Sequence, residues 1–556
     1  MDKSAKIKAE MLSRFGENQP VTDEYDPAVA VKCVNGTFVG KRENSVDVFL
    51  GIPFALPPVG NRRWKRPLPA VSDDGVYEAY YNGKSPIQTE WPTEQASYYP
   101  QGEDCLYLNI WRSRDCPDDN KSVMVFFHGG SYGWGGTADP LYDGRNFVTT
   151  HPEIILVTVG YRTGLMGFVD FSTVEGGEAF PDAPNLGILD QIEALRWIRQ
   201  NISGFSGDPD NVTIFGESAG GGSVSLLPII DEAKGLFRRV IAESGSVALT
   251  FSKEECADFT RRLLKESGAH HMDDLMRMSE EELKKVNEAL NMYNNFPQRD
   301  GRLIPFDPYE PYKNGMTADI DMLIGTNANE SNYWIGEVGG IVPYLFSTPI
   351  KFENDMKLLS SADRKLVKYA MSRMKVHEIW RMTEFYNEVM FRLPAIRQAE
   401  RHAQNGGKVY MYYWTQPSSI RFRGACHAVE LAYVFQNPQE TIFTGEPADP
   451  ALTKTVGDMW ANFARTGDPP VPGFDWIAYD EKLRATAIIC RSPHIKNDPL
   501  KAQRELLSPL LRYMINASYA TLDYNVPFVR KAVAIAAGAA VGAAVVGITL
   551  VKKLID

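Results

Sequence analysis

The sequence contains few cysteines, and none of them has the spacing of a metal site. Six cysteines are scattered over 556 residues without a single C-x-x-C pair. This arrangement excludes a zinc ribbon and gives no disulfide framework. Residues 1–15 are charged and helix-like, and they lack the apolar core of a secretory signal. We therefore expect a reducing, cytoplasmic compartment.

The chain also lacks an excess of basic residues. It carries 59 Lys and Arg against 70 Asp and Glu, which gives a net charge of −11 at pH 7, and no basic stripe or RNA-binding motif is present. Nucleic acid is therefore not an expected partner. Hydrophobic residues make up 44% of the sequence and aromatic residues 11%, so the chain can bury a large core and is not disordered.

The longest stretch without charge lies at residues 532–551. It is flanked by Arg530-Lys531 and Lys552-Lys553, and its twenty residues just span a bilayer core as a helix. Eight of these residues are Ala and three are Gly, which makes the segment only weakly apolar. We predict a C-terminal transmembrane anchor that leaves the preceding chain in the cytoplasm. The alternatives are a soluble cytoplasmic Ala-rich helix and a tail that docks on a partner.

Apolar β-rich runs alternate with helical patterns through most of the chain, and this alternation predicts an α/β fold. We expect a large, mostly parallel, twisted sheet flanked by helices, with helical cap insertions and a C-terminal apolar helix. The expected parts are an N-terminal extension at 1–25, the α/β domain at 26–516, a linker at 517–531 and the anchor at 532–551. Cap material is expected between about residues 253 and 400. The predicted strands are 123–127, 154–159, 212–215, 240–243, 322–326 and 409–414.

The pentapeptide Gly216-Glu217-Ser218-Ala219-Gly220 is the strongest local signal. It follows an apolar, β-branched run at 212–215 and opens a small-residue segment at 221–225 that can form a helix. In this strand–turn–helix context a serine is held on a tight turn with its hydroxyl exposed. Small flanking residues allow the strained turn to form. The pattern therefore predicts that Ser218 is the nucleophile of a serine hydrolase.

A second Gly-x-Ser-x-Gly match occurs at residues 129–133. It also follows an apolar run, but the residues after it, Trp134-Gly135-Gly136-Thr137-Ala138-Asp139-Pro140, cannot start a helix. We therefore interpret Ser131 as a loop residue.

A nucleophilic serine needs a base, and the base needs an acid to hold its tautomer. In this type of turn the chain order is serine, acid, histidine. His427 fits this order, on a loop after the predicted strand 409–414, and Glu330 lies on the loop after the strand 322–326. The other histidines are excluded by their order or by their local sequence: His128, His151, His270, His271, His377, His402 and His494.

Acyl transfer also needs donors for the tetrahedral oxyanion. The segment His128-Gly129-Gly130-Ser131 follows an earlier strand and resembles the H-G-G-G loop of esterases. We expect the backbone N–H groups of Gly130, Ser131 and Ala219 to form the oxyanion hole. Ser131 stands where a third glycine is usual, and its side chain narrows the site.

With these motifs the chain resembles the type-B carboxylesterases of the cholinesterase/carboxylesterase family, from about residue 26 to residue 511. The resemblance implies an α/β-hydrolase fold and a Ser218–His427–Glu330 triad at the bottom of a gorge. The motifs that carry it are FLGIPFA at 49–55, EDCLYLNIW at 103–111, GDPDNVTIFGESAG at 207–220 and ANFARTGDP at 461–469.

The same resemblance implies roles for other residues. Arg63 and Glu103 match a buried ion pair of the family, and Glu217 and Glu430 match acidic positions near the triad, where they are candidates for electrostatic support of the base. Cys105 matches a cysteine that is usually in a disulfide, but the expected upstream partner is missing from this sequence.

Trp91 lies in the loop that carries the cationic-ligand tryptophan of cholinesterases, but its spacing to the following cysteine differs from theirs. The sequence therefore gives no basis for expecting choline esters as substrates.

The expected activity is hydrolysis of small-molecule carboxylic esters through an acyl-enzyme, with neither a metal nor an organic cofactor. A thioesterase, amidase or transacylase would use the same triad. A protein of another class, a non-catalytic adhesion or scaffold relative such as the neuroligins, would typically have lost the nucleophile. The sequence does not specify the oligomeric state or the physiological ester.

Overall fold

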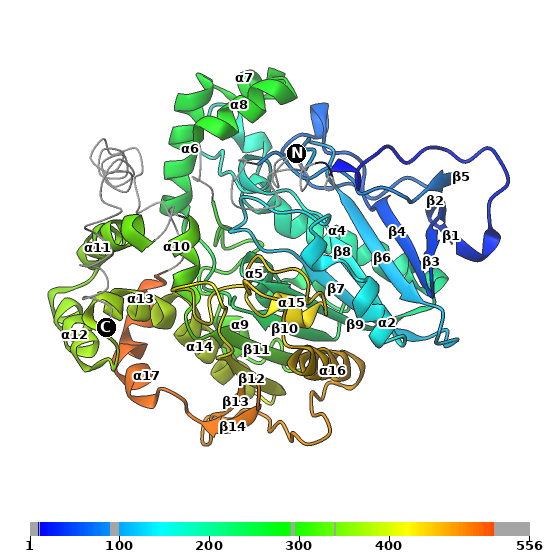
Figure 1. The fold of residues 1–556 in the computed structure, drawn as a ribbon. Helices are drawn as coiled ribbons and strands as arrows, with labels where there is room; N and C mark the ends of the chain where they lie inside the picture. The colour runs from blue at the N-terminus through cyan, green and yellow to red at the C-terminus, as the bar shows by residue number, and fades with distance from the viewer. Residues whose placement is uncertain (1–8, 10–11, 89–98, 291–294, 338–340, 516–556) are drawn as a thin grey trace, which may run out of the picture.

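An eleven-stranded mixed sheet forms the centre of the molecule in the computed structural model, which describes residue 9 and residues 12–88, 99–290, 295–337 and 341–515 (Figure 1). The strands between β8 and β13 are parallel, and antiparallel strands flank them on both sides. In spatial order the strands are β14 (His494–Asn497), β13 (Ala485–Ile489), β12 (Val409–Trp414), β11 (Asp321–Asn327), β10 (Arg239–Glu243), β9 (Gly207–Glu217), β7 (Lys121–Phe127), β8 (Ile154–Val159), β6 (Tyr107–Ser113), β4 (Val46–Pro53) and β3 (Lys41–Glu43).

All six predicted strands are confirmed, and two of them, β8 and β12, have the predicted bounds. The strand β9 begins five residues before the predicted start, because Gly207 also pairs with Lys121 of β7, and residues 208–211 lie between this pair and the regular ladder that starts at Val212. The register between β9 and β7 is irregular in this stretch, which contains Pro209. Proline has no N–H to donate to a ladder, so it is accommodated where the pairing is irregular.

The hydrophobic core lies in two layers, one on each face of the sheet. Within β7, Val123 and Val125 belong to one layer, and Met124 and Phe126 belong to the other. This alternation follows from the two-residue period of a strand, and both faces are apolar because both are covered. The first layer is covered by α4 (Leu186–Asn201), α5 (Ala219–Leu226) and α14 (Leu393–Ala403), and the second by α2 (Arg145–Thr150) and α16 (Pro450–Thr466).

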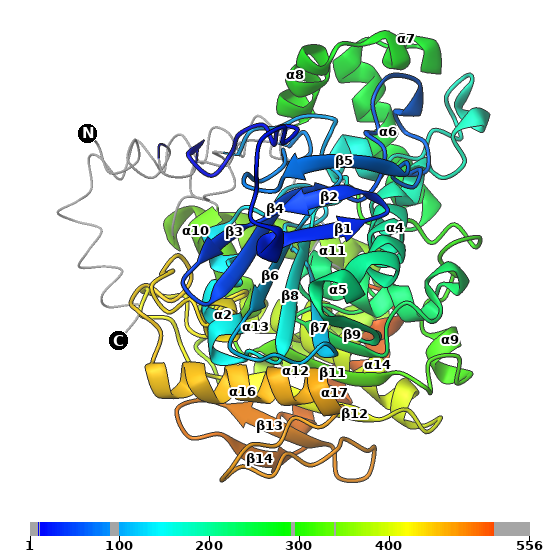
Figure 2. The ribbon, with the colours of Figure 1, turned by 90° about the vertical axis from the view of Figure 1, so that its right-hand side faces the viewer.

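A second, three-stranded sheet lies beside the first strands of the large sheet (Figure 2). The segment of the chain that precedes the small sheet is held by Asn18, whose side chain donates to the backbone carbonyls of Leu50 and Tyr81. The small sheet contains β1 (Ala30–Cys33), β2 (Asn35–Val39) and β5 (Asp73–Glu78).

The predicted cap region is helical but is not one continuous insertion, because the central strand β11 runs through it. Two groups of helices therefore stand over the carboxyl ends of the parallel strands (Figure 1). The first group is α6 (Lys253–Ser267), α7 (Met272–Arg277) and α8 (Glu280–Leu290); the second is α10 (Trp334–Glu337), α11 (Ile341–Leu358), α12 (Ser361–Arg373) and α13 (Arg381–Tyr386). The remaining helices are α3 (Gly164–Gly167), α9 (Glu310–Lys313), α15 (Leu431–Val434) and α17 (Lys501–Leu507).

The ion pair implied by the family resemblance is present and buried. Arg63 Nε donates to Glu103 Oε2 at 2.6 Å, and the same guanidinium donates to backbone carbonyls of the α7 segment, at Leu275, Met276 and Met278.

None of the six cysteines is in a disulfide, and burial raises the pKa of the Cys105 thiol well above its usual range. The loss of the family disulfide is therefore confirmed.

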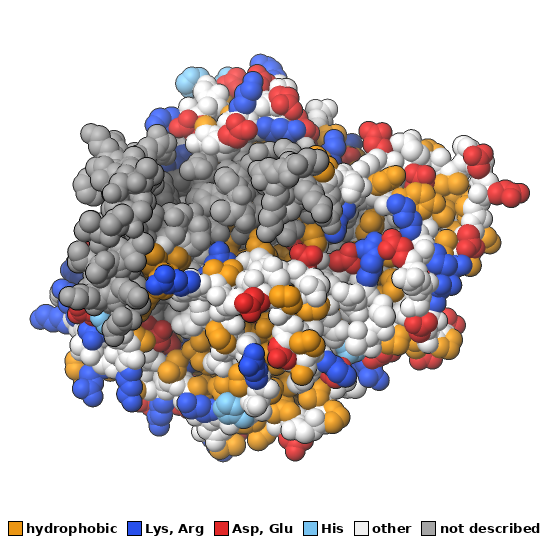
Figure 3. Space-filling view, viewed as in Figure 1, with side chains coloured by type: hydrophobic (Ala, Val, Ile, Leu, Met, Phe, Trp, Pro, Cys, Tyr) orange, Lys and Arg blue, Asp and Glu red, His pale blue; other side chains and the backbone are white. Residues whose placement is uncertain are grey.

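Within the described ranges, no helix has both the length and the hydropathy to cross a membrane. The predicted linker 517–531, the predicted anchor 532–551 and Trp91 lie outside those ranges. On the face seen in Figure 3, acidic and basic side chains are interspersed, so the negative net charge does not form one acidic patch there.

Candidate active site

Ser218 lies at the junction between β9 and α5, at the carboxyl end of a central strand. Its backbone has φ +59° and ψ −119°, a conformation that non-glycine residues rarely adopt. The turn is held from both sides, because Ser218 N–H donates to the carbonyl of Glu243 at 2.9 Å and its own carbonyl accepts from Gly222 N–H at 2.8 Å. The predicted strained strand–turn–helix is therefore confirmed.

The small residues around Ser218 are required by close backbone contacts. A Cβ added at Gly220 would lie 1.9 Å from the carbonyl oxygen of Phe127, and one at Gly221 would lie 2.5 Å from the carbonyl oxygen of Glu243. These distances are far below van der Waals contact, so only glycine fits. The first turn of α5 is thereby pressed against the ends of the neighbouring strands β7 and β10.

The loop after β7 lies directly against this turn. A Cβ at Gly129 would come within 3.2 Å of Ser218 Cβ, and one at Gly130, where φ is +101°, would lie 2.3 Å from the carbonyl oxygen of Trp134. Ser131 has φ +51°, so a side chain occupies a backbone conformation that favours glycine. Ala219 is the first residue of α5, and an N–H at this position has no acceptor within its own helix.

His128, at the start of this loop, has a structural role. Its ring stacks on Tyr161 at a centroid distance of 4.4 Å, and Nδ1 lies 2.8 Å from the carbonyl oxygen of Gly129. Burial lowers the pKa of His128 to about 4, so the ring is neutral at physiological pH.

Glu330 and His427 are brought together from the loops after β11 and β12. His427 Nδ1 lies 2.6 Å from Glu330 Oε2, and both side chains are buried. The other carboxylate oxygen, Glu330 Oε1, accepts from Ser244 Oγ and from Asn327 N–H, each at 2.7 Å. Three contacts therefore fix the carboxylate and orient the imidazole.

The second imidazole nitrogen faces another carboxylate. His427 Nε2 lies 3.1 Å from Glu217 Oε1, while Ser218 lines the same pocket as both residues. The acidic position next to the serine is therefore in direct contact with the base. Glu217 is placed where it can compete with the serine hydroxyl for Nε2.

Glu430 lies behind the imidazole and is completely buried. Its Oε2 accepts from Asn327 Nδ2. Burial, together with the charges of Glu217 and Glu330, raises the pKa of Glu430 to about 8. At neutral pH Glu430 is therefore mainly protonated and adds little negative charge to the site.

Ser244 and Glu243 were missed by the sequence analysis. Glu243 accepts from Trp460 Nε1 at 3.1 Å, and burial and the charge of Glu430 raise its pKa well above the usual range. Glu243 is the last residue of the predicted strand β10, and Ser244 directly follows it. Polar residues at the carboxyl ends of parallel strands are a signal that could have identified them.

The pocket above Ser218 is mainly aromatic, with a cavity volume of about 60 Å³. Three rings surround the imidazole: Phe391 at a centroid distance of 5.0 Å, Tyr333 at 5.8 Å and Trp334 at 6.0 Å. The cavity is small, and the aromatic rings make part of its wall apolar. Its walls are Gly129, Gly130, Ser131, Trp134, Gly135, Gly136, Asp139, Tyr142, Glu217, Ser218, Ala219, Leu249, Phe296, Tyr333, Trp334, Phe391, His427, Ala428, Leu431 and Phe443.

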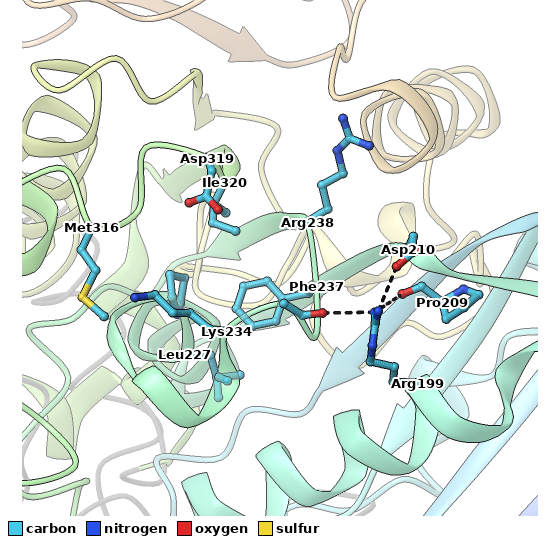
Figure 4. A pocket seen from close by; sticks show the side chains of 13 residues that line it. Arg199, Pro209, Asp210, Leu227, Lys234, Phe237, Arg238, Met316, Asp319 and Ile320 are labelled. Atoms are coloured by element: carbon cyan, nitrogen blue, oxygen red, sulfur yellow. Dashed lines mark hydrogen bonds and ion pairs between the residues drawn. The ribbon is translucent and has the colours of Figure 1, made fainter.

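A second hollow, of about 220 Å³, lies at the amino ends of the central strands β9 and β10, which is the end of the sheet opposite to Ser218 (Figure 4). Its Arg199 donates to the carbonyls of Pro209 and Gly235 and pairs with Asp210. Its lining includes no serine, cysteine or histidine. Across the described ranges, no group of three or more His, Cys, Asp or Glu side chains is arranged to hold a metal.

Comparisons with known proteins agree with this architecture. A family model described as "Carboxylesterase family" matches residues 26–505. The chain is 35% identical to the para-nitrobenzyl esterase of Bacillus subtilis (strain 168), and the match covers 85% of this chain and 97% of the relative. It is 32% identical to the bile salt-activated lipase of Bos taurus, and that match covers 77% of this chain and 76% of the relative. The crystal structure of a Geobacillus stearothermophilus carboxylesterase superposes with a TM-score of 0.77 at 32% identity, over 86% of this chain and 99% of that one.

Proposed function

The chain belongs to the carboxylesterase family and is a carboxylic ester hydrolase, and from this premise we propose that it works through a Ser218–His427–Glu330 triad and an acyl-enzyme. The observation that carries the proposal is the 2.6 Å contact between Glu330 and His427, beside a pocket that is also lined by the strained Ser218. An acid, a base and a nucleophile in this relation form the machinery of acyl transfer.

In the first half-reaction His427 Nε2 turns from Glu217 toward Ser218 and accepts the hydroxyl proton. Ser218 Oγ then attacks the ester carbonyl, and the negative charge on the carbonyl oxygen is met by the N–H groups of Gly130, Ser131 and Ala219. When the tetrahedral intermediate collapses, the carbon–oxygen bond to the alcohol breaks, and the imidazolium donates its proton to that oxygen.

In the second half-reaction water attacks the acyl-enzyme, with His427 again as the base. The carboxylic acid leaves and Ser218 regains its proton. Glu330 accepts from His427 Nδ1–H and stabilises the imidazolium that forms in each half-reaction. Glu217, which contacts His427 Nε2, supports the imidazole electrostatically, whereas the mainly protonated Glu430 adds little charge, and no cofactor takes part in the proposed steps.

The experiment that tests this proposal is the replacement of the nucleophile. We expect Ser218→Ala to lower kcat on an aryl ester by roughly 10⁶-fold and to abolish labelling by a fluorophosphonate probe. The matched control is Ser225→Ala, on the same helix, because the buried Ser225 hydroxyl has no hydrogen-bond partner. A Ser218→Ala enzyme with ordinary activity would rule out the triad, and an unlabelled native chain would favour the non-catalytic adhesion class.

The bond that is cleaved requires its own test, because thioesterases, amidases and transacylases use the same three groups. We propose an oxygen ester as the substrate, on the strength of the esterase and lipase relatives. Values of kcat/KM on an ester, thioester and amide with identical acyl groups should be highest for the ester. A higher value for the thioester or the amide would contradict this choice.

Membrane attachment through residues 532–551 remains a prediction from the sequence. We propose that the full chain pellets with membranes and that a chain ending at residue 516 does not. Recovery of the full chain in the supernatant without detergent would contradict the anchor.

A further inference from the structure

The helix that crosses beside the proposed acid contains a π-helical segment. Residues Asn387–Arg392 have π-helical hydrogen bonding between α13, which ends at Tyr386, and α14, which begins at Leu393. Such segments are rare and are frequently found at functional sites. Here the segment lies against the loop that carries Glu330.

The first residue of this segment, Asn387, holds that loop on both sides of Glu330. Asn387 Oδ1 accepts from Ser331 N–H at 2.8 Å, and its Nδ2 donates to the carbonyl of Ala328 at 3.2 Å. The Asn387 side chain is 5% exposed, so water does not replace these bonds readily. One amide thus satisfies a donor and an acceptor of the buried loop.

Two other asparagines hold the same loop, but they attach it to the histidine side. Asn329 exchanges hydrogen bonds with the backbone of Ala425, at 2.9 and 3.0 Å, and Asn327 Nδ2 donates to the carbonyl of Cys426 at 2.9 Å. Asn387 attaches the loop to the second group of cap helices on both sides of Glu330, and Tyr344 of α11 adds one contact, from its hydroxyl to the carbonyl of Ser331 at 3.3 Å.

We propose that Asn387 is a positioning residue that fixes the Glu330 carboxylate for its contact with His427. This inference depends on the triad proposed above. Without the amide, Ser331 N–H is left buried without an acceptor, and the backbone around Glu330 can shift toward another partner. A shift of about 1 Å in a catalytic group can lower the rate about 100-fold. The same segment carries Phe391, whose ring packs on His427, so it contacts the proposed base directly and the backbone on either side of Glu330.

The primary test compares Asn387→Ala with a matched control elsewhere in the fold. Asn201 is also 5% exposed, and it likewise accepts from one backbone N–H, that of Val34, and donates to one backbone carbonyl, that of Trp197. We expect Asn387→Ala to lower kcat on an aryl ester about 10- to 100-fold with KM changed less than about twofold. Asn201→Ala should leave kcat per fluorophosphonate-titrated site unchanged. Equal kcat values for the two variants would overturn the proposal.

A double-mutant cycle separates positioning from a general structural effect. If Asn387 acts through Glu330, Asn387→Ala should lower kcat less than about twofold in a Glu330→Gln background. An undiminished loss in that background would overturn the proposal. If Asn387→Ala does not fold, Asn387→Asp keeps the acceptor for Ser331 N–H and loses the donor to Ala328. Asn387→Asp should still lower kcat, because the hydrogen bond on the Ala328 side of Glu330 is lost, and native kcat in Asn387→Asp would overturn the proposal.

The failure of this inference is distinguishable from the failure of the proposed function. If the triad is wrong, Ser218→Ala retains activity, whatever Asn387 does. If only the positioning role is wrong, Ser218→Ala is inactive while Asn387→Ala and Asn201→Ala have the same kcat.

Discussion

Glu430 offers a prediction about stability that depends on its buried proton. The side chain is fully buried, and its pKa is raised to about 8 by burial and by the charges of Glu217 and Glu330. Replacement by Gln keeps the size of the side chain and an acceptor for Asn327, and it removes the ionisable group. We expect Glu430→Gln to be more stable than the native protein at pH 7.

The expected gain follows from proton binding. In the unfolded chain Glu430 releases its proton near its ordinary pKa of 4.5, whereas the folded protein keeps it up to about pH 8. Between these values the unfolded state binds fewer protons, so the free energy of unfolding falls as pH rises, by about 1.4 kcal/mol per unit. At pH 7 this amounts to about 3 kcal/mol, and the effect levels off above pH 8.

Thermal unfolding curves measured from pH 4.5 to pH 9 would test this reasoning. The Tm of Glu430→Gln should match that of the native protein near pH 4.5 and exceed it increasingly up to pH 8. The control is Glu281→Gln, since the Glu281 side chain is 76% exposed, and its Tm should follow the native curve. Parallel curves for Glu430→Gln and the native protein at all pH values would refute the argument.

Three further substitutions have expected outcomes. Glu330→Gln should lower kcat roughly 10³- to 10⁴-fold, because an amide N–H cannot accept from the imidazole and favours the wrong tautomer. Steady-state kinetics on an aryl ester would measure this loss of kcat, and a loss below tenfold would contradict the prediction. Gly220→Ala should yield little folded protein, because its Cβ would lie 1.9 Å from the carbonyl oxygen of Phe127; a native Tm would be inconsistent with this contact. Arg63→Ala should destabilise the fold by about 3–5 kcal/mol in denaturant unfolding, since Glu103 is left buried and unpaired, and an unchanged midpoint would contradict that cost.

The sheet and the turn around Ser218 could be predicted because their sequence signals are local. Fully buried strands such as β7 and β8 appear as continuous apolar runs, since both of their faces are covered. The turn requires glycine at positions where the backbone contacts are closest, so its pattern is visible in the sequence. Chain order then selected Glu330 and His427, which the structure brings to 2.6 Å.

The rest of the site could not be predicted because it depends on contacts between distant segments. No local pattern indicates that His427 Nε2 faces Glu217, or that Asn387 reaches the loop after β11. The aromatic wall of the pocket comes from several separate segments, and its rings resemble ordinary core residues in the sequence. The sequence predicted both cap material at about 253–400 and a strand at 322–326, but helical periodicity does not reveal that this strand lies in the central sheet and divides the cap helices into two groups.

The order of the strands in the sheet has a consequence for biosynthesis. The proposed nucleophile follows β9 and the proposed base follows β12, so a ribosome makes Ser218 long before the imidazole of His427 emerges. A nascent chain that has exposed only the first of these segments carries the serine hydroxyl without the group that would accept its proton. We expect such a chain not to be acylated, and we expect recovery of turnover after denaturation to report that the late strands have joined the early ones.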